Sequence, residues 1–352
     1  MKRALLAALL LLLAHGGVGA QLSYSRGQNV SPGYEGWEQN ADGSFSFLFG
    51  YMNRNWLEEI DVPVGPDNML SPGPADRGQP THFLPRRNRF TFKVRVPADF
   101  GDQEMVWTLT TQGKTEHAYA SLRTDYKIDN MVIASETGAL GAGTSSPETR
   151  SNVTPVLEII GDTELTARVG QPLTLVAKLT DDGRPRRGRS SARVAADSAA
   201  DAAADAGAAS AGAANSGAAG SSASEAAADH AEADTGPRLS ARALRPPSRV
   251  TVGKIVGLHL SWFVYRGPES VRPGPDEVLF DPVQVKAWED TRAAANSPWG
   301  PLWTPPELPE DGIWKVQVTF DEPGTYVLRA RADDGALYAD QDVTVNVTTL
   351  LP

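Results

Sequence analysis

The chain has 352 residues, a formal net charge of −10 at pH 7 and no cysteine. The acidic balance argues against a nucleic-acid binder, which needs a basic surface to follow phosphates. Without cysteine the protein has neither disulfides nor thiolate metal ligands, so we expect apolar packing alone to hold it together.

The first twenty residues have the pattern of a secretory signal peptide. A basic Lys2-Arg3 pair precedes an apolar run that is too short to span a bilayer, and small residues at 18–20 suit signal cleavage before Gln21. We therefore predict a signal peptide over 1–20 and a soluble, periplasmic or secreted protein with no integral membrane segment after cleavage. The Ala-, Arg- and Asp-rich composition indicates a bacterial source.

Short alternating segments follow the signal. Aromatic residues at every second position from Phe45 to Tyr51 predict a strand with its aromatic side chains on one face. The same period recurs from Phe90 to Val96, where Pro97 ends the strand, and from Met105 to Thr111. Frequent Gly and Pro separate these strands, so we predict an antiparallel β-sandwich domain over 21–137 with little helix.

The stretch FGYMNRNWLEEIDVPVGPDN, at 49–68, resembles an active-site segment because it contains aromatic, amide and acidic residues close together. Proline and glycine are so frequent from Asp61 to Phe83 that we expect a long ordered loop lying over the sheet, without regular pairing. Arg54 is expected to form surface ion pairs with the acids at 58, 59 and 61. We interpret the stretch as architecture.

The second half divides into a linker, a module and an insertion. A Gly/Ser/Thr-rich linker is predicted over 138–156, and a second domain over 157–183 and 250–348. Between its two parts, residues 184–249 are rich in Ala, Ser, Gly and Asp, which predicts a disordered insertion. The remaining segments give roughly seven strands, the number of a simple immunoglobulin-like sandwich.

The sequence DEPGTYVLRARADDGALYADQDVTVNV, at 321–347, resembles the last two strands of a bacterial immunoglobulin-like or PKD-like module. Tyr326 matches the tyrosine of the corner motif, and Trp262 matches the core tryptophan of the third strand. Leu328 and Leu175 occupy the places of the usual cysteine pair. The resemblance implies an all-β protein of two antiparallel, immunoglobulin-like β-sandwich domains and a role in adhesion or scaffolding, without implying an activity.

Motifs for catalysis do not stand out in the sequence. No two histidines have zinc-ligand spacing, and there is no nucleophile elbow or phosphate-binding glycine loop. Glu58, Glu59 or Asp61 would need a facing partner that the sequence does not identify. His259 alternates with core residues and is expected to face outward. We predict a protein that is not an enzyme, with no catalytic residues and no cofactor.

Two Asp-Asp-Gly turns suggest a calcium site. Asp181 and Asp182 follow the second strand of the immunoglobulin-like module, and Asp333 and Asp334 follow the sixth, so the topology places all four at one end. Four carboxylates are suitable hard ligands for calcium. The alternative is that each Asp-Gly pair simply makes a turn.

A tryptophan- and proline-rich loop at 298–306 presents Trp299 and Trp303, which are candidate ligand-binding residues for sugars or proline-rich partners; Trp314 follows in a predicted core strand. We predict an exported, non-catalytic binding or scaffolding protein whose partner is an unknown extracytoplasmic protein or glycan. The alternative is a carbohydrate-binding or carbohydrate-processing protein that uses this loop. A metal-assisted enzyme is the third hypothesis.

Overall fold

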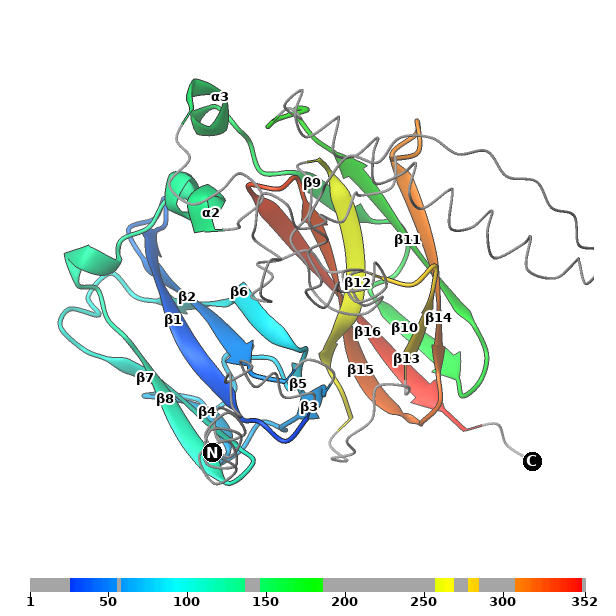
Figure 1. The fold of residues 1–352 in the computed structure, drawn as a ribbon, viewed down its shortest axis with the longest axis horizontal. Coiled ribbons are helices and arrows are strands. Elements are labelled where there is room, and N and C mark those ends of the chain that lie inside the picture. The colour runs from blue at the N-terminus through cyan, green and yellow to red at the C-terminus, as the bar shows by residue number, and fades with distance from the viewer. Residues whose placement is uncertain are drawn as a thin grey trace, which may run out of the picture.

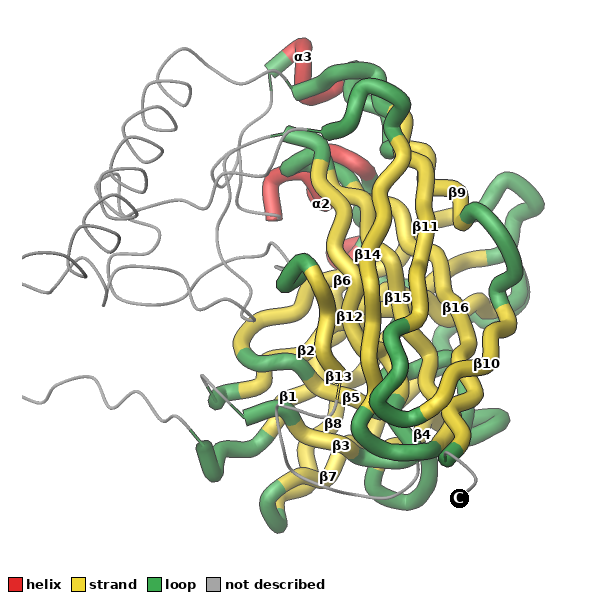
Figure 2. The backbone as a smooth tube through the Cα atoms, turned by 90° about the vertical axis from the view of Figure 1, so that its right-hand side faces the viewer, coloured by secondary structure: helices red, strands yellow, loops and turns green. Residues whose placement is uncertain are grey.

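The structure, a computed structural model, describes residues 26–55, 58–136, 146–185, 257–268, 278–284 and 308–349. Two β-rich modules lie side by side, with the strand β12 between them (Figure 1). Nearly all of the regular structure is strand, and the short α-helices lie at one end (Figure 2). The predicted signal peptide, nearly all of the predicted insertion, and the loop carrying Trp299 and Trp303 fall outside the described residues.

The N-terminal module is an antiparallel β-sandwich. Its two three-stranded sheets have the orders β1-β2-β6 and β4-β7-β8, and β3 pairs with β5 in a third, two-stranded sheet. The strands are β1 (Val30–Gln39), β2 (Phe45–Asn53), β3 (Ile60–Asp61), β4 (Asn68–Ser71), β5 (His82–Phe83), β6 (Arg86–Val96), β7 (Met105–Thr111) and β8 (Lys114–Ala120).

Aromatic rings fill the core between these sheets. Phe49 stacks on Phe92 with ring centroids 5.1 Å apart, and Trp107 meets Phe92 edge-on at 5.0 Å. The predicted aromatic face of β2 is confirmed, since Phe47 and Phe49 are fully buried in this core. The opposite face is buried as well, because Leu48 packs against a small cluster that reaches the second module.

The prediction of an unpaired loop from Asp61 to Phe83 was wrong in part. Within it β4 pairs with β7, and β5 pairs with β3. Asn68 makes this possible, because its buried amide donates to the carbonyls of Val62 and Pro80 and accepts from the indole of Trp107. The side chain thus satisfies polar groups that the proline-rich backbone leaves without ladder partners.

The second module has the strand order of an immunoglobulin-like sandwich. One sheet has the order β13-β14-β11-β9 and the other β10-β16-β15-β12, with β10 running parallel to the last strand, β16. The predicted insertion lies between β11 and β12. The strands are β9 (Val156–Ile159), β10 (Glu164–Arg168), β11 (Leu173–Thr180), β12 (His259–Arg266), β13 (Val278–Asp281), β14 (Ile313–Phe320), β15 (Gly324–Asp333) and β16 (Tyr338–Thr348).

The core of this module confirms the expected landmarks. Trp262 is 1% exposed, and Leu175 and Leu328 are buried in the same cluster. The Tyr326 hydroxyl donates to the Glu322 carbonyl oxygen at 3.1 Å, as the tyrosine corner requires. Trp314, which was expected in the core, is half-buried and packs at its margin. His259 was expected to face outward, but it is 4% exposed because its ring lies against Trp314.

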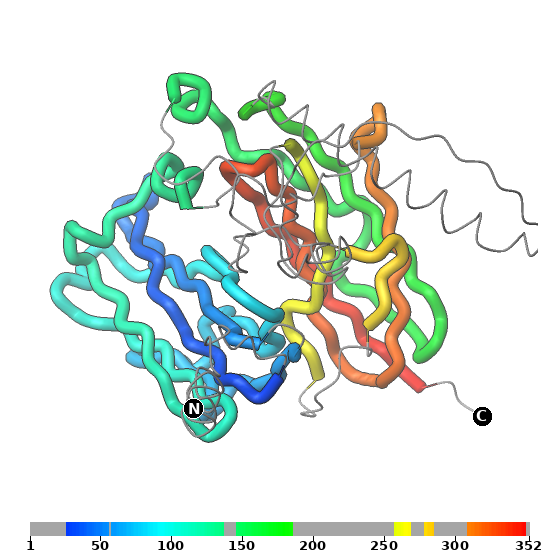
Figure 3. Tube along the Cα trace, in the orientation of Figure 1, coloured from blue at the N-terminus to red at the C-terminus, as the bar shows by residue number. Residues whose placement is uncertain are grey.

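Short helices connect the modules: η1 (Thr124–Tyr126), α2 (Asn130–Glu136) and α3 (Pro147–Arg150). The Ser146 hydroxyl caps α3 by accepting from the Thr149 amide at 3.1 Å. Figure 3 follows the chain from the blue and cyan N-terminal module through this green connection into the second module. In the part of the chain that is described, no helix has the length and apolar character needed to cross a membrane.

A candidate binding site between the modules

The N-terminal module covers the outer face of the second module's sheet along β12 and the adjoining part of β15. Trp262 and Val264 of β12 point into the core of their own sandwich, whereas Phe263 and Tyr265 join the aromatic core of the N-terminal module. Consecutive side chains of one strand therefore belong to two different cores. This arrangement makes β12 a shared element of the two modules.

A bulge in β6 prepares the other side of the contact. Phe49 pairs with Phe92 and Tyr51 with Asn88, so Gly50 alone lies opposite three residues of β6. A Cβ at Gly50 would overlap the Asn88 carbonyl oxygen, so glycine is required here. Within the bulge, Phe90 has a φ of 49°, in the left-handed region. The bulge leaves backbone carbonyls free to accept hydrogen bonds from outside the ladder.

Two arginines of β15 use these carbonyls. Arg331 donates to the Phe90 carbonyl oxygen at 3.0 Å, and Arg329 donates to the Thr91 carbonyl oxygen at 2.5 Å. Both guanidinium groups lie in the contact between the modules and are nearly inaccessible to solvent. Hydrogen bonds from a charged donor to backbone are stronger than neutral ones, so these contacts tie the modules together.

Each arginine also has a cross-strand carboxylate partner on β16. The register pairs Arg329 with Asp342 and Arg331 with Asp340. Arg329 donates to Asp342 at 2.6 and 2.8 Å, and Arg331 donates to Asp340 at 2.7 Å from two nitrogens. Both pairs are bidentate, the geometry that best compensates for removing a guanidinium from water. We call these four side chains the arginine–aspartate ladder.

Aromatic rings complete the shielding of the ladder. The Arg329 guanidinium lies 3.4 Å from the ring centroid of Tyr265, and that of Arg331 lies 4.2 Å from the centroid of Tyr338. Burial alone would lower the pKa of Arg331, but the Asp340 carboxylate outweighs it and raises that pKa. Burial raises the pKa of Tyr265 to about 12. The arginines therefore stay charged and the tyrosines neutral near pH 7.

A second seam joins the modules at the end of β12. The Tyr265 hydroxyl donates to the Gly78 carbonyl oxygen at 2.5 Å, and the Tyr265 carbonyl oxygen accepts from the Thr81 amide at 3.2 Å. Arg266 donates to both carboxylate oxygens of Asp76, at 2.7 and 3.0 Å. The proline-rich loop of the N-terminal module thus holds β12 through backbone and side-chain hydrogen bonds.

The stretch that resembled an active site contributes a buried charge cluster. His82 lies between two carboxylates, with Nδ1 2.8 Å from Asp61 Oδ1 and Nε2 3.0 Å from Glu59 Oε2. Burial would lower its pKa, but Asp61 and Glu59 outweigh this and raise the pKa to about 10. Both ring nitrogens are occupied, so His82 has no free nitrogen with which to act as a general base. Arg54 pairs with Glu116 at 3.7 Å rather than with Glu58, Glu59 or Asp61, which corrects the expectation from the sequence.

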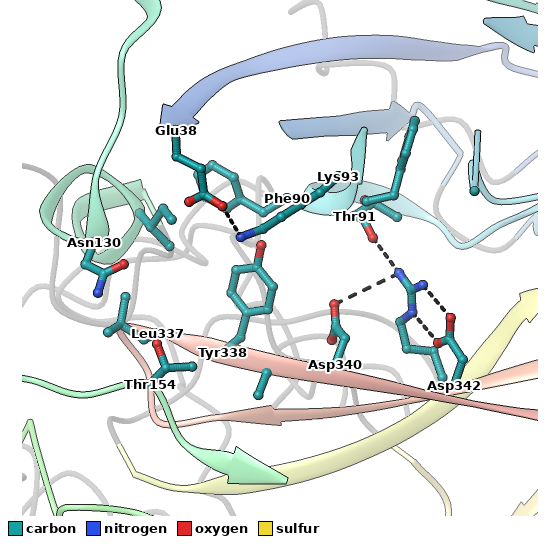
Figure 4. Close-up of a pocket in the computed structure, with 15 residues that line it drawn as sticks. Glu38, Phe90, Thr91, Lys93, Asn130, Thr154, Leu337, Tyr338, Asp340 and Asp342 are labelled. Atoms are coloured by element: carbon teal, nitrogen blue, oxygen red, sulfur yellow. Dashed lines mark hydrogen bonds and ion pairs between the residues drawn. The ribbon is translucent and has the colours of Figure 1, made fainter. Parts of the chain in front are cut away.

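A cavity of about 520 Å³ lies between the modules beside the ladder. Figure 4 shows its walls, with Lys93 and Glu38 on the N-terminal side facing Tyr338, Asp340 and Asp342 on the other. At one end, Asn130 and Thr154 come from the connecting segments. Its size is in the range of small-molecule sites, and its walls are fixed by the hydrogen bonds described above.

The four aspartates predicted to bind calcium make turns. Asp181 accepts from the Gly183 amide at 3.0 Å, and Asp333 accepts from the Gly335 amide at 2.6 Å. Asp182 accepts from the Arg184 amide at 2.9 Å. Asp334 is nearly inaccessible to solvent, and burial raises its pKa to about 6.

The segment before β9 lies between the two turns. Asn152 donates to Asp334 at 2.9 Å, and Arg184 donates to Ser151 at 2.5 Å, so both turns contact this segment. Within the described residues, no group of three or more His, Cys, Asp or Glu side chains is placed to hold a metal ion. The calcium site stays a prediction, which a calorimetric calcium titration of wild type and the Asp333→Asn/Asp334→Asn variant tests. The tryptophan site at Trp299 and Trp303 also stays a prediction.

Sequence reasoning missed the contact between the modules. The signal was present, because Arg329 and Arg331 alternate on one strand and Asp340 and Asp342 alternate on the next. Opposite charges with matching period on paired strands indicate a cross-strand ladder. Whether that ladder faces water or another module depends on the tertiary arrangement, which the sequence pattern does not determine.

No protein-family model matches the chain, and no curated protein matches it. Among solved structures, a chimeric titin Z1Z2 is 7% identical with a TM-score of 0.21, and the match covers 91% of this chain and 98% of that one. The N-terminal eight immunoglobulin domains of Down syndrome cell adhesion molecule are 8% identical with a TM-score of 0.22, covering 92% of this chain and 27% of that one. Similarities with TM-scores this low do not support an assignment of fold or function. The immunoglobulin-like assignment rests on the strand order and core of the second module itself.

Proposed function

We propose that the protein is an exported, non-catalytic binding protein whose ligand occupies the cavity between the two modules. The observation that carries this proposal is the arginine–aspartate ladder, whose two buried arginines fix the two walls of the cavity relative to each other. A binding site held in shape before the ligand arrives loses less entropy on binding. Export is supported by the signal-like first twenty residues.

Binding explains the cavity better than catalysis does. The charged groups in the walls are paired with one another, and His82, whose pKa its two carboxylates raise, has both ring nitrogens occupied by those carboxylates. A catalytic acid or base needs a proton position that faces the substrate. The buried charges of this protein are arranged to hold structure, which leaves the cavity for recognition.

Native mass spectrometry tests the proposal. The mature chain, purified from its own compartment without denaturation, is expected to carry a small molecule. Thr154→Trp places a bulky side chain in the cavity from an exposed position and is expected to remove that molecule. Thr115→Trp is the matched control, because Thr115 is an exposed threonine of β8 outside the cavity.

Two results would count against binding in the cavity. One is a preparation that carries no small molecule, and the other is a molecule that remains on Thr154→Trp. Retention by the Thr115→Trp control separates occupation of the cavity from a general effect of an added tryptophan. Location of the chain in the cytoplasmic fraction would overturn the export part of the proposal alone.

A further inference from the structure

We propose that the cavity between the modules takes a neutral, hydroxyl-rich ligand, namely a sugar of one or two units. This inference rests on the proposed function, since it assigns a ligand class to the same cavity. The residues that form this cavity lie within the described structure and do not include the loop at 298–306.

The charges that line the cavity already have partners. The Lys93 ammonium lies 2.6 Å from a Glu38 carboxylate oxygen, and Arg329 is paired with Asp342 through two hydrogen bonds. Asp340, the remaining acid in the walls, accepts two hydrogen bonds from Arg331. A ligand with a net charge would have to compete with the buried arginine pairs or with the more exposed Lys93–Glu38 pair, and it would bear the desolvation of its own charge. The walls therefore disfavour a charged ligand.

Three neutral polar groups of the walls remain available. Within the described residues, no hydrogen bond is formed by the Tyr338 hydroxyl, the Thr154 hydroxyl or the Asn130 carboxamide, and all three residues line the cavity. In Figure 4 the Tyr338 hydroxyl points toward the Lys93–Glu38 pair on the opposite wall. A hydroxyl both donates and accepts, and a carboxamide offers donors and an acceptor side by side. Neighbouring hydroxyl groups of a sugar match this set.

The rest of the lining suits the carbon skeleton of a sugar. Phe90, Ile133 and Leu337 contribute apolar surface beside the neutral polar groups. A sugar ring has apolar C–H surfaces as well as hydroxyl groups. The apolar side chains of the cavity can contact the former, and its neutral polar groups can form hydrogen bonds with the latter. A cavity of about 520 Å³ lies within the range of small-molecule sites, at the size that one or two sugar rings require.

The test uses a matched panel of probes on the mature protein. Maltose, cellobiose and N,N′-diacetylchitobiose are the neutral probes, and glucuronic acid and glucosamine are the charged ones. Saturation-transfer NMR detects binding and calorimetry measures it. We expect at least one neutral disaccharide to bind with a Kd of about 1 μM or tighter and to exceed every charged probe.

Side-chain variants locate the binding. Tyr338→Phe removes one hydroxyl and keeps the ring over Arg331, so affinity is expected to fall about tenfold. Tyr119→Phe is the control, because Tyr119 is 57% exposed on β8 and lies outside the cavity. Its affinity is expected to equal that of wild type. Asn130→Ala, an exposed position, provides a second loss that does not depend on Tyr338.

The outcomes separate the ligand class from the proposed function. A charged probe that binds best and is lost in Thr154→Trp overturns the neutral-sugar assignment while binding in the cavity stands. The same holds if no neutral probe binds although a native molecule is retained and is lost in Thr154→Trp. A neutral sugar that binds equally to wild type and to Thr154→Trp contradicts the inference, because its site is then elsewhere. Absence of both native molecule and probe binding overturns the inference and the proposed function together.

Discussion

The sheet β10-β16-β15-β12 buries its inner face, and it buries its outer face along β12 and the adjoining part of β15, yet these two buried surfaces are built from different chemistry. The inner face is apolar, with Trp262, Leu328 and Val343 packed in the core of the second module. The outer face carries the arginine–aspartate ladder, and the other module covers it where Arg329 and Arg331 lie. The apolar side chains of the inner face need only complementary shapes in order to pack, whereas each charged side chain buried on the outer face needs a partner of opposite charge or a hydrogen-bond acceptor. The difference explains why the inner face stabilises one module and the outer face fixes two modules in one geometry.

The largest expected effect lies on the inner face. Trp262→Ala removes a fully buried indole and leaves a cavity, so the free energy of unfolding is expected to fall by about 3–5 kcal/mol. Urea denaturation followed by circular dichroism measures the change. A midpoint close to that of wild type would mean that the inner face is not the core described here.

The next effect concerns His82, which directly follows the proline-rich segment that forms hydrogen bonds with the end of β12. His82→Gln leaves Asp61 and Glu59 buried without their cation, which is expected to cost about 3 kcal/mol at pH 6. The folded pKa of about 10 exceeds the ordinary value of 6.5. The stabilisation is therefore complete below about pH 6.5 and is lost as pH rises toward 10.

Denaturation midpoints measured from pH 6 to pH 10 check this dependence. The stability of wild type is expected to decrease across this window, and the difference between wild type and His82→Gln is expected to shrink in parallel. A difference that stays constant from pH 6 to pH 10 would show that His82 is not held protonated by its two carboxylates.

A smaller effect is expected within the ladder. Arg331→Met removes the hydrogen bond to the Phe90 carbonyl oxygen and leaves Asp340 without its bidentate partner, at a cost of about 2 kcal/mol. Adding Asp340→Leu removes the carboxylate that has lost its bidentate partner and is expected to restore part of the loss. Urea denaturation of the single and double variants measures both changes. If the second substitution adds its own full penalty, the two side chains are not coupled.

The smallest effect comes from one hydroxyl. Tyr265→Phe keeps the ring beneath Arg329 but removes the hydrogen bond to the Gly78 carbonyl oxygen, which is expected to cost about 1 kcal/mol. The thermal midpoint by calorimetry measures the change, with Tyr119→Phe as a surface control. Equal midpoints for the two variants would show that this seam contributes nothing.

The sequence predicted the inner face better than the outer one. The period of two and the tyrosine-corner motif located Trp262, Tyr326 and Leu328 because those positions depend on local geometry and on burial in one module. The same reasoning placed His259 outward, and it did not predict that Phe263 and Tyr265 of β12 enter the core of the N-terminal module. An alternating pattern shows which side chains lie outside their own sandwich, but it does not show whether water or another module covers them. The bulge at Phe90 was also missed, because it arises from a register shift opposite Gly50, and no turn residue marks it in β6.

The candidate site was less predictable than the fold. The acids at 59 and 61 were identified, but their partner His82 lies more than twenty residues away, and only the pairing of β3 with β5 brings them together. The cavity draws its walls from β6, β16 and the connecting segments, so no continuous motif describes it. Sites of this kind depend on how two modules meet, which single-sequence patterns do not encode.

The measurement that tests the central claim most directly is the calorimetric unfolding of wild type beside the Arg329→Met/Arg331→Met variant. If the ladder fixes the two modules in one body, wild type unfolds in a single transition whose calorimetric and van't Hoff enthalpies agree, and the variant unfolds in two. Two separate transitions in wild type, unchanged in the variant, would contradict the account.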